Sequence, residues 1–340
     1  MKRYGIQERR LGKSGVIETE TKRVLITGAS GFIGSNLARY LLNCGYEIYV
    51  VIRKSSNLWR LNDIASDIQI QYIVDSSPEE FSYILESAKP DILINSIGAD
   101  QNKNLRDDTS IWSGNFIILT NIARALKKLK NIFFIQSGSS FEYGRATIEH
   151  NPLSEEVRCD PVSEYGISKL YATDYLSYLG KNWSLSTAVL RIFNVYGPYE
   201  NGNRLVPDLI IRSLLSSAIL LKNPSVRRDF IHISDVAEAF RSTIVKEDRL
   251  RNGSLVVNIG TGISSSVEEV ANVVNKITGN NMKIETESSD KRPENYIPGP
   301  VADNKKARSV LDWKPKLTID NGLKETIGWF KDHKELYQKF

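Results

Sequence analysis

The sequence predicts an α/β protein: a doubly wound parallel sheet followed by a smaller mixed α/β portion in the C-terminal half. From residue 23 to about residue 192, short runs rich in Ile, Val and Leu alternate with longer segments of helical periodicity. Such near-continuous apolar strands are typical of a parallel sheet whose two faces are both covered by helices. Beyond about residue 194, short strands and helices mix with Pro- and Gly-containing loops, which indicates a second, smaller portion.

The elements of the first portion follow one another in a regular order. Strands are predicted at 23–27, 47–52, 68–74, 91–98, 131–139 and 185–192, and helices at 32–45, 78–89, 108–130 and 163–180. A serine cap, a glutamate at capping-box spacing and a glycine stop predict a further helix over 264–279. We therefore expect a flexible polar arm over 1–22, a nucleotide-binding domain over 23–194 and a mainly substrate-binding portion over 195–340. The chain is expected to cross between the two portions more than once.

Composition limits the class of protein. The 340 residues carry a net charge of +5, without the basic, aromatic-interleaved stripe typical of nucleic-acid binding. No apolar run approaches the roughly 18–20 residues of a membrane span, and the N-terminus lacks an apolar signal-peptide core. We therefore expect a cytoplasmic protein that binds neither nucleic acid nor membrane. The two cysteines and three scattered histidines favour neither a disulfide framework nor a metal site.

A glycine-rich turn between the first strand and the first helix predicts a nucleotide site. "TGASGFIG" places Gly28, Gly31 and Gly34 at this turn. The first glycine permits a tight turn, the second lets the backbone approach a pyrophosphate, and the third allows close packing of helix on strand. Phosphates would then lie against free N–H groups at the helix N-terminus. The glycine spacing alone is a weak signal, but the strand before it and the apolar helix after it favour cofactor binding.

Three side chains form a candidate catalytic set. "SEYGISK" places Tyr165 and Lys169 four residues apart, on one face of the predicted helix. Ser139 ends the fifth strand, and ligands of open parallel sheets bind beyond the carboxyl ends of the strands. A nearby ammonium favours the phenolate form of a tyrosine, so Tyr165 could exchange a proton with an alcohol or a carbonyl oxygen. Ser139 could hydrogen-bond the same oxygen, and Lys169 could also hold the nicotinamide ribose.

With these motifs the chain resembles the extended short-chain dehydrogenase/reductase family, in its NAD(P)-dependent nucleotide-sugar epimerase/dehydratase/reductase branch. The resemblance runs from about residue 23 to about residue 330. It rests on seven motifs in the family's order: "TGASGFIG", "NSIG", "SGSSFEYG", "YGISK", "RIFNVYGP", "RRDFIHISDVAEAF" and "RPENYIPGPVADNKKARSVLDWKP". It implies a Rossmann fold, a nicotinamide cofactor and a sugar linked to a nucleoside diphosphate. It assigns catalytic roles to Ser139, Tyr165 and Lys169, and a structural or proton-relay role to Asn115, for which a helix-cap or surface role is the alternative.

The resemblance also implies two sets of binding residues. The cofactor set is Gly28, Ser30, Gly31, Phe32, Ile33, Gly34, Arg53, Ser55, Asp75 and Lys169. The substrate set is Ser139, Ser140, Asn194, Leu205, Val206, Arg228 and Arg292. Asn194 and the two arginines would hold the diphosphate, since guanidinium binds phosphate through paired, charge-assisted hydrogen bonds. A surface ion pair is the alternative for each arginine. Leu205 and Val206 would line the nucleoside pocket.

The residues after Ser139 narrow the reaction. Dehydratases of this branch place an Asp–Glu pair there, where this chain has Ser140 and Phe141, so dehydration is disfavoured. Glu142 comes one place later and, on a strand-like segment, would point the other way. Phe141 also replaces the cysteine of fucose-synthase-like enzymes, which disfavours combined epimerisation and reduction. Simple hydride transfer remains, either as reduction of a 4-keto sugar or as epimerisation at one centre.

Arg53 favours reduction over epimerisation. It stands where the family's ribose-binding aspartate is found, and with Lys54 and Ser55 it predicts a site for the 2′-phosphate of NADP(H). A surface arginine over the adenine is the alternative. Cells hold NADPH reduced for net reductions, so the expectation is an NADPH-dependent 4-ketoreductase of a nucleotide-activated 4-keto-6-deoxy sugar in deoxysugar biosynthesis, with NAD the weaker cofactor candidate. A nucleotide-sugar epimerase is the alternative, and a non-catalytic NADP-binding module is a second one.

The 108–130 helix predicts a homodimer because it is apolar on two sides. These sides are marked by Ile111, Ile118, Ile122 and Leu129, and by Phe116, Leu119, Ala123 and Leu126. One side could cover the sheet. The other could meet a partner together with the 163–180 helix, as in the paired-helix interface of the family.

Overall fold

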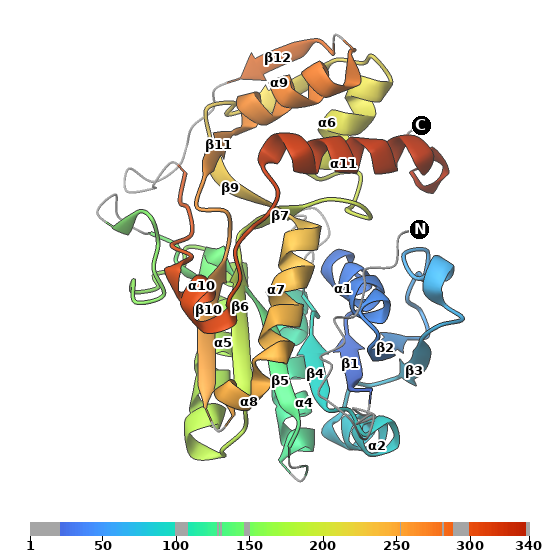
Figure 1. Ribbon diagram of the computed structural model, residues 1–340, viewed down its shortest axis with the longest axis vertical. Helices are drawn as coiled ribbons and strands as arrows, with labels where there is room; N and C mark the ends of the chain where they lie inside the picture. The colour runs from blue at the N-terminus through green and yellow to red at the C-terminus, as the bar shows by residue number, and fades with distance from the viewer. Residues whose placement is uncertain are drawn as a thin grey trace, which may run out of the picture.

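Within the residues that the structure describes, seven strands form one parallel sheet (Figure 1). This computed structural model describes residues 21–98, 108–127, 129, 131–145, 150–251, 253–280, 282–287 and 299–337. The strand order is β10-β6-β5-β4-β1-β2-β3, and every neighbouring pair is parallel. The strands are β1 (Arg23–Thr27), β2 (Glu47–Arg53), β3 (Gln69–Ile73), β4 (Ile92–Asn95), β5 (Phe133–Ser139), β6 (Thr187–Ile192) and β10 (Ser254–Ile259). The predicted fold class is confirmed.

Helices cover both faces of this sheet and bury one apolar core on each. On one face lie α1 (Phe32–Asn43), α7 (Ile233–Val245), and α10 (Lys305–Leu311), and on the other α2 (Pro78–Ala88), α4 (Ile118–Leu126) and α5 (Glu164–Asn182). Alternate residues of a strand point to opposite faces. Thus in β1, Val24 and Ile26 join the first core, while Leu25 joins the second. This double covering explains the nearly continuous apolar strands.

A smaller mixed portion lies above the main sheet in Figure 1. Its strands form a three-stranded sheet of order β11-β9-β7 and a parallel β12-β8 pair. Their bounds are β7 (Asn194–Tyr196), β8 (Ile219–Lys222), β9 (Arg227–His232), β11 (Ser264–Ser266) and β12 (Ile284–Glu287). The helices α6 (Leu205–Leu214), α9 (Val267–Thr278) and α11 (Ile319–Asp332) enclose a third core with these strands. Short elements are α8 (Glu247–Leu250) and the 3-10 turns Asn62–Ile64, Ser140–Glu142 and Lys334–Leu336.

The helix predicted over 264–279 is confirmed in its details. Ser266 caps α9 by accepting from the backbone N–H of Glu269 at 3.0 Å, and Glu269 accepts in return from the Ser266 N–H at 3.0 Å. Gly279 ends the helix in the left-handed region, with φ of 71°. Each of these residues was expected at its place because caps are read from local spacing alone.

The helix predicted over 108–130 is wrong in two respects. It comprises α3 (Asp108–Trp112), a π-helical turn (Ser113–Ile117) and α4, which ends at Leu126. Ile122 from one predicted apolar side and Leu119 from the other are fully buried in the core against the sheet. Phe116 and Ile118, one from each side, are only partly buried, so the expected contact with a partner stays a prediction.

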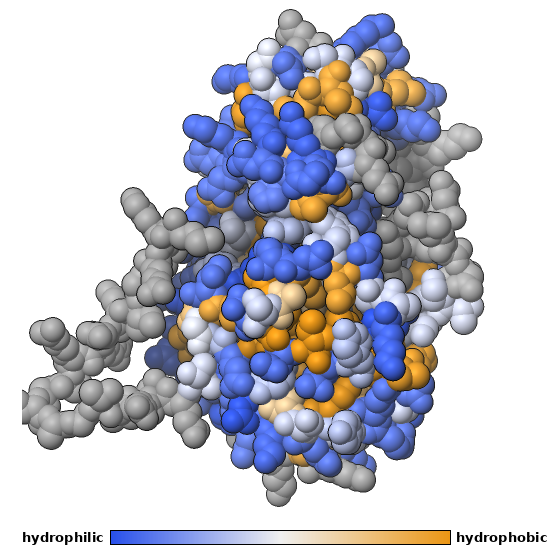
Figure 2. Space-filling view, turned by 90° about the vertical axis from the view of Figure 1, so that its right-hand side faces the viewer, coloured by the Kyte–Doolittle hydropathy of each residue, from blue (hydrophilic) through white to orange (hydrophobic). Residues whose placement is uncertain are grey.

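The main sheet has β10 at one edge and β3 at the other, and apolar and aromatic side chains are exposed near β3. Figure 2 faces the side on which α1, β2, β3 and α2 lie in Figure 1, and apolar side chains gather at the middle of it. Among the exposed residues of β3, the turn after it and α2, Tyr72 is 50% exposed, Val74 76% and, on α2, Tyr83 72%. In the described part of the chain, no helix combines the length and the apolar character needed to cross a membrane. Residues 1–20 of the predicted arm lie outside the described residues.

Candidate functional site

The glycine-rich loop leaves no room for side chains. Gly28 has φ of +73°, and a Cβ on it would lie 2.6 Å from Ile97 N and 2.7 Å from Ser96 O. A Cβ on Gly34 would lie 2.4 Å from Gly28 O. Gly31 is the N-cap of α1 and has no side chain to cap the helix, so the first N–H groups of α1 can receive an anion. The loop therefore fits the pyrophosphate of a dinucleotide.

A cavity of about 550 Å³ opens beyond the carboxyl ends of β1, β4 and β5. This edge, where the strand order reverses between β1 and β4, is where ligands bind in open α/β sheets. The predicted site residues that line it are Gly31, Phe32, Ile33, Ser139, Ser140, Tyr165, Lys169, Asn194, Leu205, Val206 and Arg228. The structure thus brings most of the predicted cofactor, catalytic and substrate residues to one cavity. Gly28, Ser30, Gly34, Arg53, Ser55, Asp75 and Asn115 do not line it, and Arg292 lies outside the described residues.

Tyr165 and Lys169 project from the first turns of α5 into this cavity. Lys169 is 4% exposed, its Nζ donates to Ser137 O at 3.1 Å, and Nζ lies 5.8 Å from the centre of the Tyr165 ring. The Tyr165 ring packs edge-to-face on Phe141, with 5.8 Å between ring centres. Phe141, at a position where dehydratases of the branch have a carboxylate, therefore supports the tyrosine ring instead.

Asn115 lies in the π-helical turn beside Lys169. It is fully buried, and its Nδ2 donates to Ser168 Oγ at 2.9 Å. A Cβ on Gly98 would lie 3.6 Å from both Asn115 Oδ1 and Lys169 Nζ, so these two groups flank the same glycine after β4. The burial rules out the surface role considered for Asn115. π-helical turns occur frequently at functional sites, which fits the structural or relay role.

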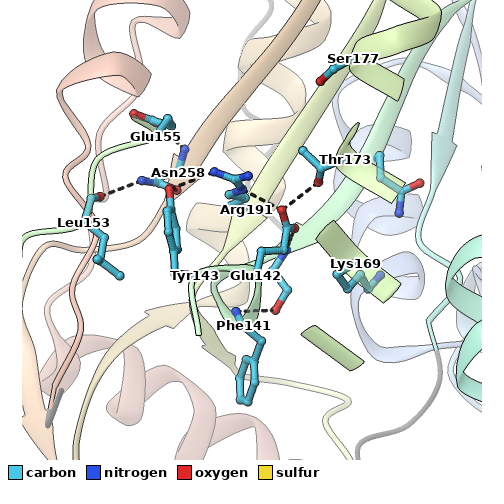
Figure 3. Close-up of polar contacts among 12 residues, drawn as sticks. Phe141, Glu142, Tyr143, Leu153, Glu155, Lys169, Thr173, Ser177, Arg191 and Asn258 are labelled. Carbon is cyan, nitrogen blue, oxygen red and sulfur yellow. Dashed lines mark hydrogen bonds and ion pairs between the residues drawn. The ribbon is translucent and has the colours of Figure 1, made fainter. Parts of the chain in front are cut away.

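Ser139 ends β5 and caps the 3-10 turn that follows. It is 6% exposed, and its Oγ accepts from the Phe141 N–H at 3.2 Å. Glu142 is fully buried and does not line the cavity, as expected. The reason expected for this was wrong, because the segment is a 3-10 turn and not a strand. The Glu142 carboxylate instead pairs with Arg191 at 2.8 Å (Figure 3).

Three predicted cofactor residues outside the glycine-rich loop, Arg53, Ser55 and Asp75, lie at the same edge of the sheet as that loop. β2 pairs with β1 in the register Thr27 with Val51, and Arg53 is the last residue of β2. Arg53 and Ser55 are both exposed. Asp75 follows β3, and its carboxylate accepts from the Ser77 N–H at 2.8 Å. This hydrogen bond lowers the pKa of Asp75, which favours its ionised form.

Three charged residues of the cavity, Arg60, Glu200 and Arg204, have no counterpart among the predicted ones. Arg60 is 8% exposed; its Nε donates to Tyr199 O at 2.8 Å and its Nη1 to Ser30 O at 3.4 Å, so it joins the glycine-rich loop to the second portion. Glu200 is 7% exposed, and within the described residues its buried Oε2 has no hydrogen-bond partner. Burial raises the pKa of Glu200 to about 8, against the opposing charge of Arg204. The acidic residue two places after "NVYGP" was the available signal for Glu200.

Glu200→Gln should make folding stability less dependent on pH. The carboxyl stays protonated in the folded chain up to about pH 8, whereas in the unfolded chain it ionises near its ordinary value of 4.5. Between these values the folded state binds the extra proton, so its stability falls as pH rises, by up to about 1.4 kcal/mol per pH unit. Urea unfolding of both proteins at several pH values in this window measures the slopes. Identical slopes would show that Glu200 is already ionised when folded.

The comparisons with known proteins agree with this geometry. Residues 24–260 match the NAD dependent epimerase/dehydratase family. The chain is 26% identical to a putative UDP-glucose 4-epimerase of Methanocaldococcus jannaschii, over 91% of this chain and 99% of that protein. Among solved structures it is similar to the UDP-glucose 4-epimerase of Thermotoga maritima with UDP-glucose, with a TM-score of 0.81, 25% identity and coverage of 91% of this chain and 99% of that one. It is also similar to MoeE5 in complex with UDP-glucose and NAD, with a TM-score of 0.78, 26% identity and coverage of 91% and 99%.

The family match spans well over half of the chain and contains the glycine-rich loop, the strand end at Ser139 and the helix with Tyr165 and Lys169. Its C-terminal limit, residue 260, directly follows β10, the strand that completes the main sheet. The chain is an NAD(P)-dependent nucleotide-sugar-modifying enzyme and belongs to the NAD dependent epimerase/dehydratase family, the extended short-chain dehydrogenase/reductase enzymes that the sequence motifs resemble.

Proposed function

We propose that the protein is an NAD(P)-dependent epimerase of a nucleoside-diphosphate sugar. The observation that carries this proposal is that Ser139, Tyr165 and Lys169 line one cavity, which also reaches the N-terminus of α1. The reductase that the sequence alone favoured becomes the second candidate. Two of the similar proteins are named UDP-glucose 4-epimerase, which supports epimerisation over net reduction.

The chain's own residues supply the proton transfers of such a reaction. The glycine-rich loop and Lys169 would hold a nicotinamide cofactor, which would supply the hydride acceptor and donor of such a reaction. Tyr165 takes the hydroxyl proton as the carbinol becomes a ketone, and gives it back when the ketone is reduced. Ser139 donates a hydrogen bond to the same oxygen. Lys169 Nζ, held by Ser137 O at 3.1 Å, lies 5.8 Å from the centre of the Tyr165 ring, so the side chains of Lys169 and Tyr165 lie together at the reacting oxygen.

The second portion supplies candidate contacts for the nucleoside diphosphate. Arg228 and Asn194 line the cavity, and a guanidinium and an amide are suitable donors for phosphate oxygens. Leu205 and Val206 begin α6 and line the same cavity, where they form an apolar surface for the nucleoside. Arg292 remains a predicted contact. The substrate would thus lie between the two portions, with its sugar toward Tyr165.

Reduction of a 4-keto sugar is the second candidate, and Arg53 favours it. An exposed arginine at the end of β2 suits a 2′-phosphate, and NADPH serves net reductions. Dehydration is disfavoured because the residues after Ser139 place no carboxylate in the cavity: Phe141 packs on Tyr165, and Glu142 is buried away from it. A non-catalytic NADP-binding module is the third candidate.

Product analysis with a panel of nucleotide sugars separates these candidates. The purified protein is incubated with CDP-, dTDP-, GDP- and UDP-hexoses and their 4-keto-6-deoxy forms, with either cofactor. An epimer that forms without change in nicotinamide absorbance supports the epimerase. Oxidation of NADPH in step with loss of the keto sugar would replace it by the reductase. Cofactor binding without turnover of any sugar would support the non-catalytic module.

We also propose that the protein forms a homodimer through an aromatic face on α3, the π-helical turn that follows it and α5. In this face Trp112 and Phe116 contact Tyr171 edge-to-face at 5.7 and 6.1 Å between ring centres, and Phe116 contacts Tyr175 at 5.9 Å. Tyr171 is 54% exposed and Ile117 49%. Exposed apolar groups that adjoin one another commonly mark protein interfaces, and a second copy would cover these rings.

Tyr171→Glu should convert this dimer to a monomer. A carboxylate buried against the partner's rings would lose its hydration without gaining an opposite charge. Light scattering at micromolar concentration measures the mass. Tyr83→Glu, on α2 and 72% exposed in the protomer, is the matched control and should leave the mass unchanged. A monomeric mass for the unaltered protein would contradict the proposal directly.

A further inference from the structure

We propose that Glu142 is a positioning residue that fixes Ser139 at the reacting oxygen. This inference rests on the hydride-transfer function proposed above. Glu142 is fully buried and does not line the cavity, so it cannot touch the substrate itself. Figure 3 shows its carboxylate between Thr173 and Arg191, with the Phe141 ring pointing the other way. Any effect of Glu142 on the chemistry must therefore pass through a neighbour.

The Glu142 carboxylate joins three elements of the site. Its Oε1 accepts from the backbone N–H of Ser139 at 2.8 Å, at the end of β5. Its Oε2 accepts from Thr173 Oγ1 on α5 at 2.8 Å and from Arg191 Nε on β6 at 2.8 Å. Since α5 also carries Tyr165 and Lys169, one carboxylate fixes the position of Ser139 relative to the helix that carries the tyrosine.

The same contacts orient the Ser139 hydroxyl. Glu142 holds the Ser139 N–H, while Ser139 Oγ accepts from the Phe141 N–H at 3.2 Å, and together these bonds form a capping box. A hydroxyl has one proton to donate. Because Oγ is already an acceptor within the turn, its proton is available for an oxygen in the cavity. A donor fixed in this way needs no reorientation when the substrate binds.

Neighbouring residues give the Glu142 carboxylate both space and an opposite charge. A Cβ on Gly138 would lie 2.8 Å from Val189 Cγ1 and 2.9 Å from Glu142 Oε1, so only glycine leaves the carboxylate its place. Arg191, 5% exposed, balances the charge, and its Nη1 donates to Tyr143 Oη at 3.3 Å. The Tyr143 hydroxyl in turn donates to Asn258 Oδ1 at 2.8 Å, as Figure 3 shows.

Stabilising the fold is the competing role for this ion pair. A buried ion pair can often be replaced by apolar residues without loss of stability, so variants that lack both charges are expected to fold. Two double variants separate the roles. Glu142→Leu/Arg191→Met removes the pair and the acceptor for the Ser139 N–H. Glu142→Gln/Arg191→Met removes the pair but keeps an amide oxygen as that acceptor. Both remove the buried charges together, so neither leaves an unpaired one.

We expect the Leu/Met variant to lose about 10²-fold in kcat, the cost of a misplaced catalytic group, with KM for the sugar nearly unchanged. The Gln/Met variant should stay close to the unaltered protein. In a Ser139→Ala background, the Leu/Met change should cost nothing further, since a residue that acts through Ser139 has no effect once the hydroxyl is gone. Equal rates for the two double variants, or a further full loss in the Ser139→Ala background, would overturn the proposal.

Amide hydrogen exchange keeps this test separate from the proposed reaction. The Ser139 N–H should be protected in the unaltered protein and in the Gln/Met variant, and should exchange faster in the Leu/Met variant. Equal protection in both variants overturns the positioning role even if no substrate is turned over. Conversely, failure of the unaltered protein to convert any nucleotide sugar, with the exchange difference present, counts against the proposed function and leaves the fixing of Ser139 supported.

Discussion

Tyr165→Phe is expected to lower turnover by about 10²–10⁴-fold, the usual size of an acid–base contribution. The substitution removes the phenol oxygen that exchanges the proton and keeps the ring. The ring's contact with Phe141, at 5.8 Å between centres, should therefore persist, and folding should barely change. Steady-state rates on the preferred nucleotide sugar measure the effect, with thermal unfolding and cofactor binding measured alongside.

Tyr178→Phe provides the matched control. Tyr178 lies on the same helix, is 51% exposed and does not line the cavity, so loss of its hydroxyl should leave the rate unchanged. If Tyr165→Phe also kept near-normal turnover, another group would have to move the proton. Glu200, which lines the cavity, would then become the next candidate.

Arg53→Asp is expected to reverse the preference between the two nicotinamide cofactors. We propose that the unaltered protein prefers NADPH by roughly ten- to a hundredfold, since a hydrogen bond to a charged group contributes about 1.5–3 kcal/mol. The introduced carboxylate would repel the 2′-phosphate and accept a hydrogen bond from the ribose hydroxyl of NADH. The ratio of kcat/KM for the two cofactors measures the change. Lys54 and Ser55 leave some binding of NADPH.

Arg249→Asp is the matched control. It makes the same change of charge on α8, which follows the C-terminal end of α7, and should leave the cofactor ratio unaltered. Equal use of NADH and NADPH by the unaltered protein would contradict the role of Arg53. The same assay bears on the reaction. A preference for NADPH together with its net consumption would strengthen the reductase, whereas a preference without consumption fits an epimerase that carries NADP.

The fold could be predicted where local pattern determines it. The strand Arg23–Thr27 and the caps of α9 lie where expected because apolar runs and capping spacing act over a few residues. The strand Ser254–Ile259 could not be assigned to the main sheet, because nothing in its own residues specifies pairing with β6, more than 60 positions earlier. The π-helical turn at Asn115 was also missed, since helical periodicity does not distinguish it from an α-helix.

The same distinction holds for the candidate site: residues in local motifs could be predicted, and residues placed by tertiary packing could not. Ser139, Tyr165 and Lys169 lie in motifs whose spacing already places them at one edge of a sheet, and the structure brings them to one cavity. Arg60 and Glu200 lie in loops, and only tertiary packing carries them to the same place. Glu142 was expected to avoid the cavity, but its partner Arg191 lies 49 residues away, so the ion pair was invisible in the local pattern.

The late position of β10 has a consequence for how the chain is made. β6 is flanked by β5 and β10 in the finished sheet, yet β10 is synthesised last of the seven strands, after β7, β8 and β9 of the second portion. Until then the nascent chain presents β6 as an open edge with unpaired N–H and C=O groups, which invites pairing with another chain. A fragment ending before residue 254 would keep that edge permanently, so the nucleotide-binding half cannot be excised as an independent unit by cutting the chain once.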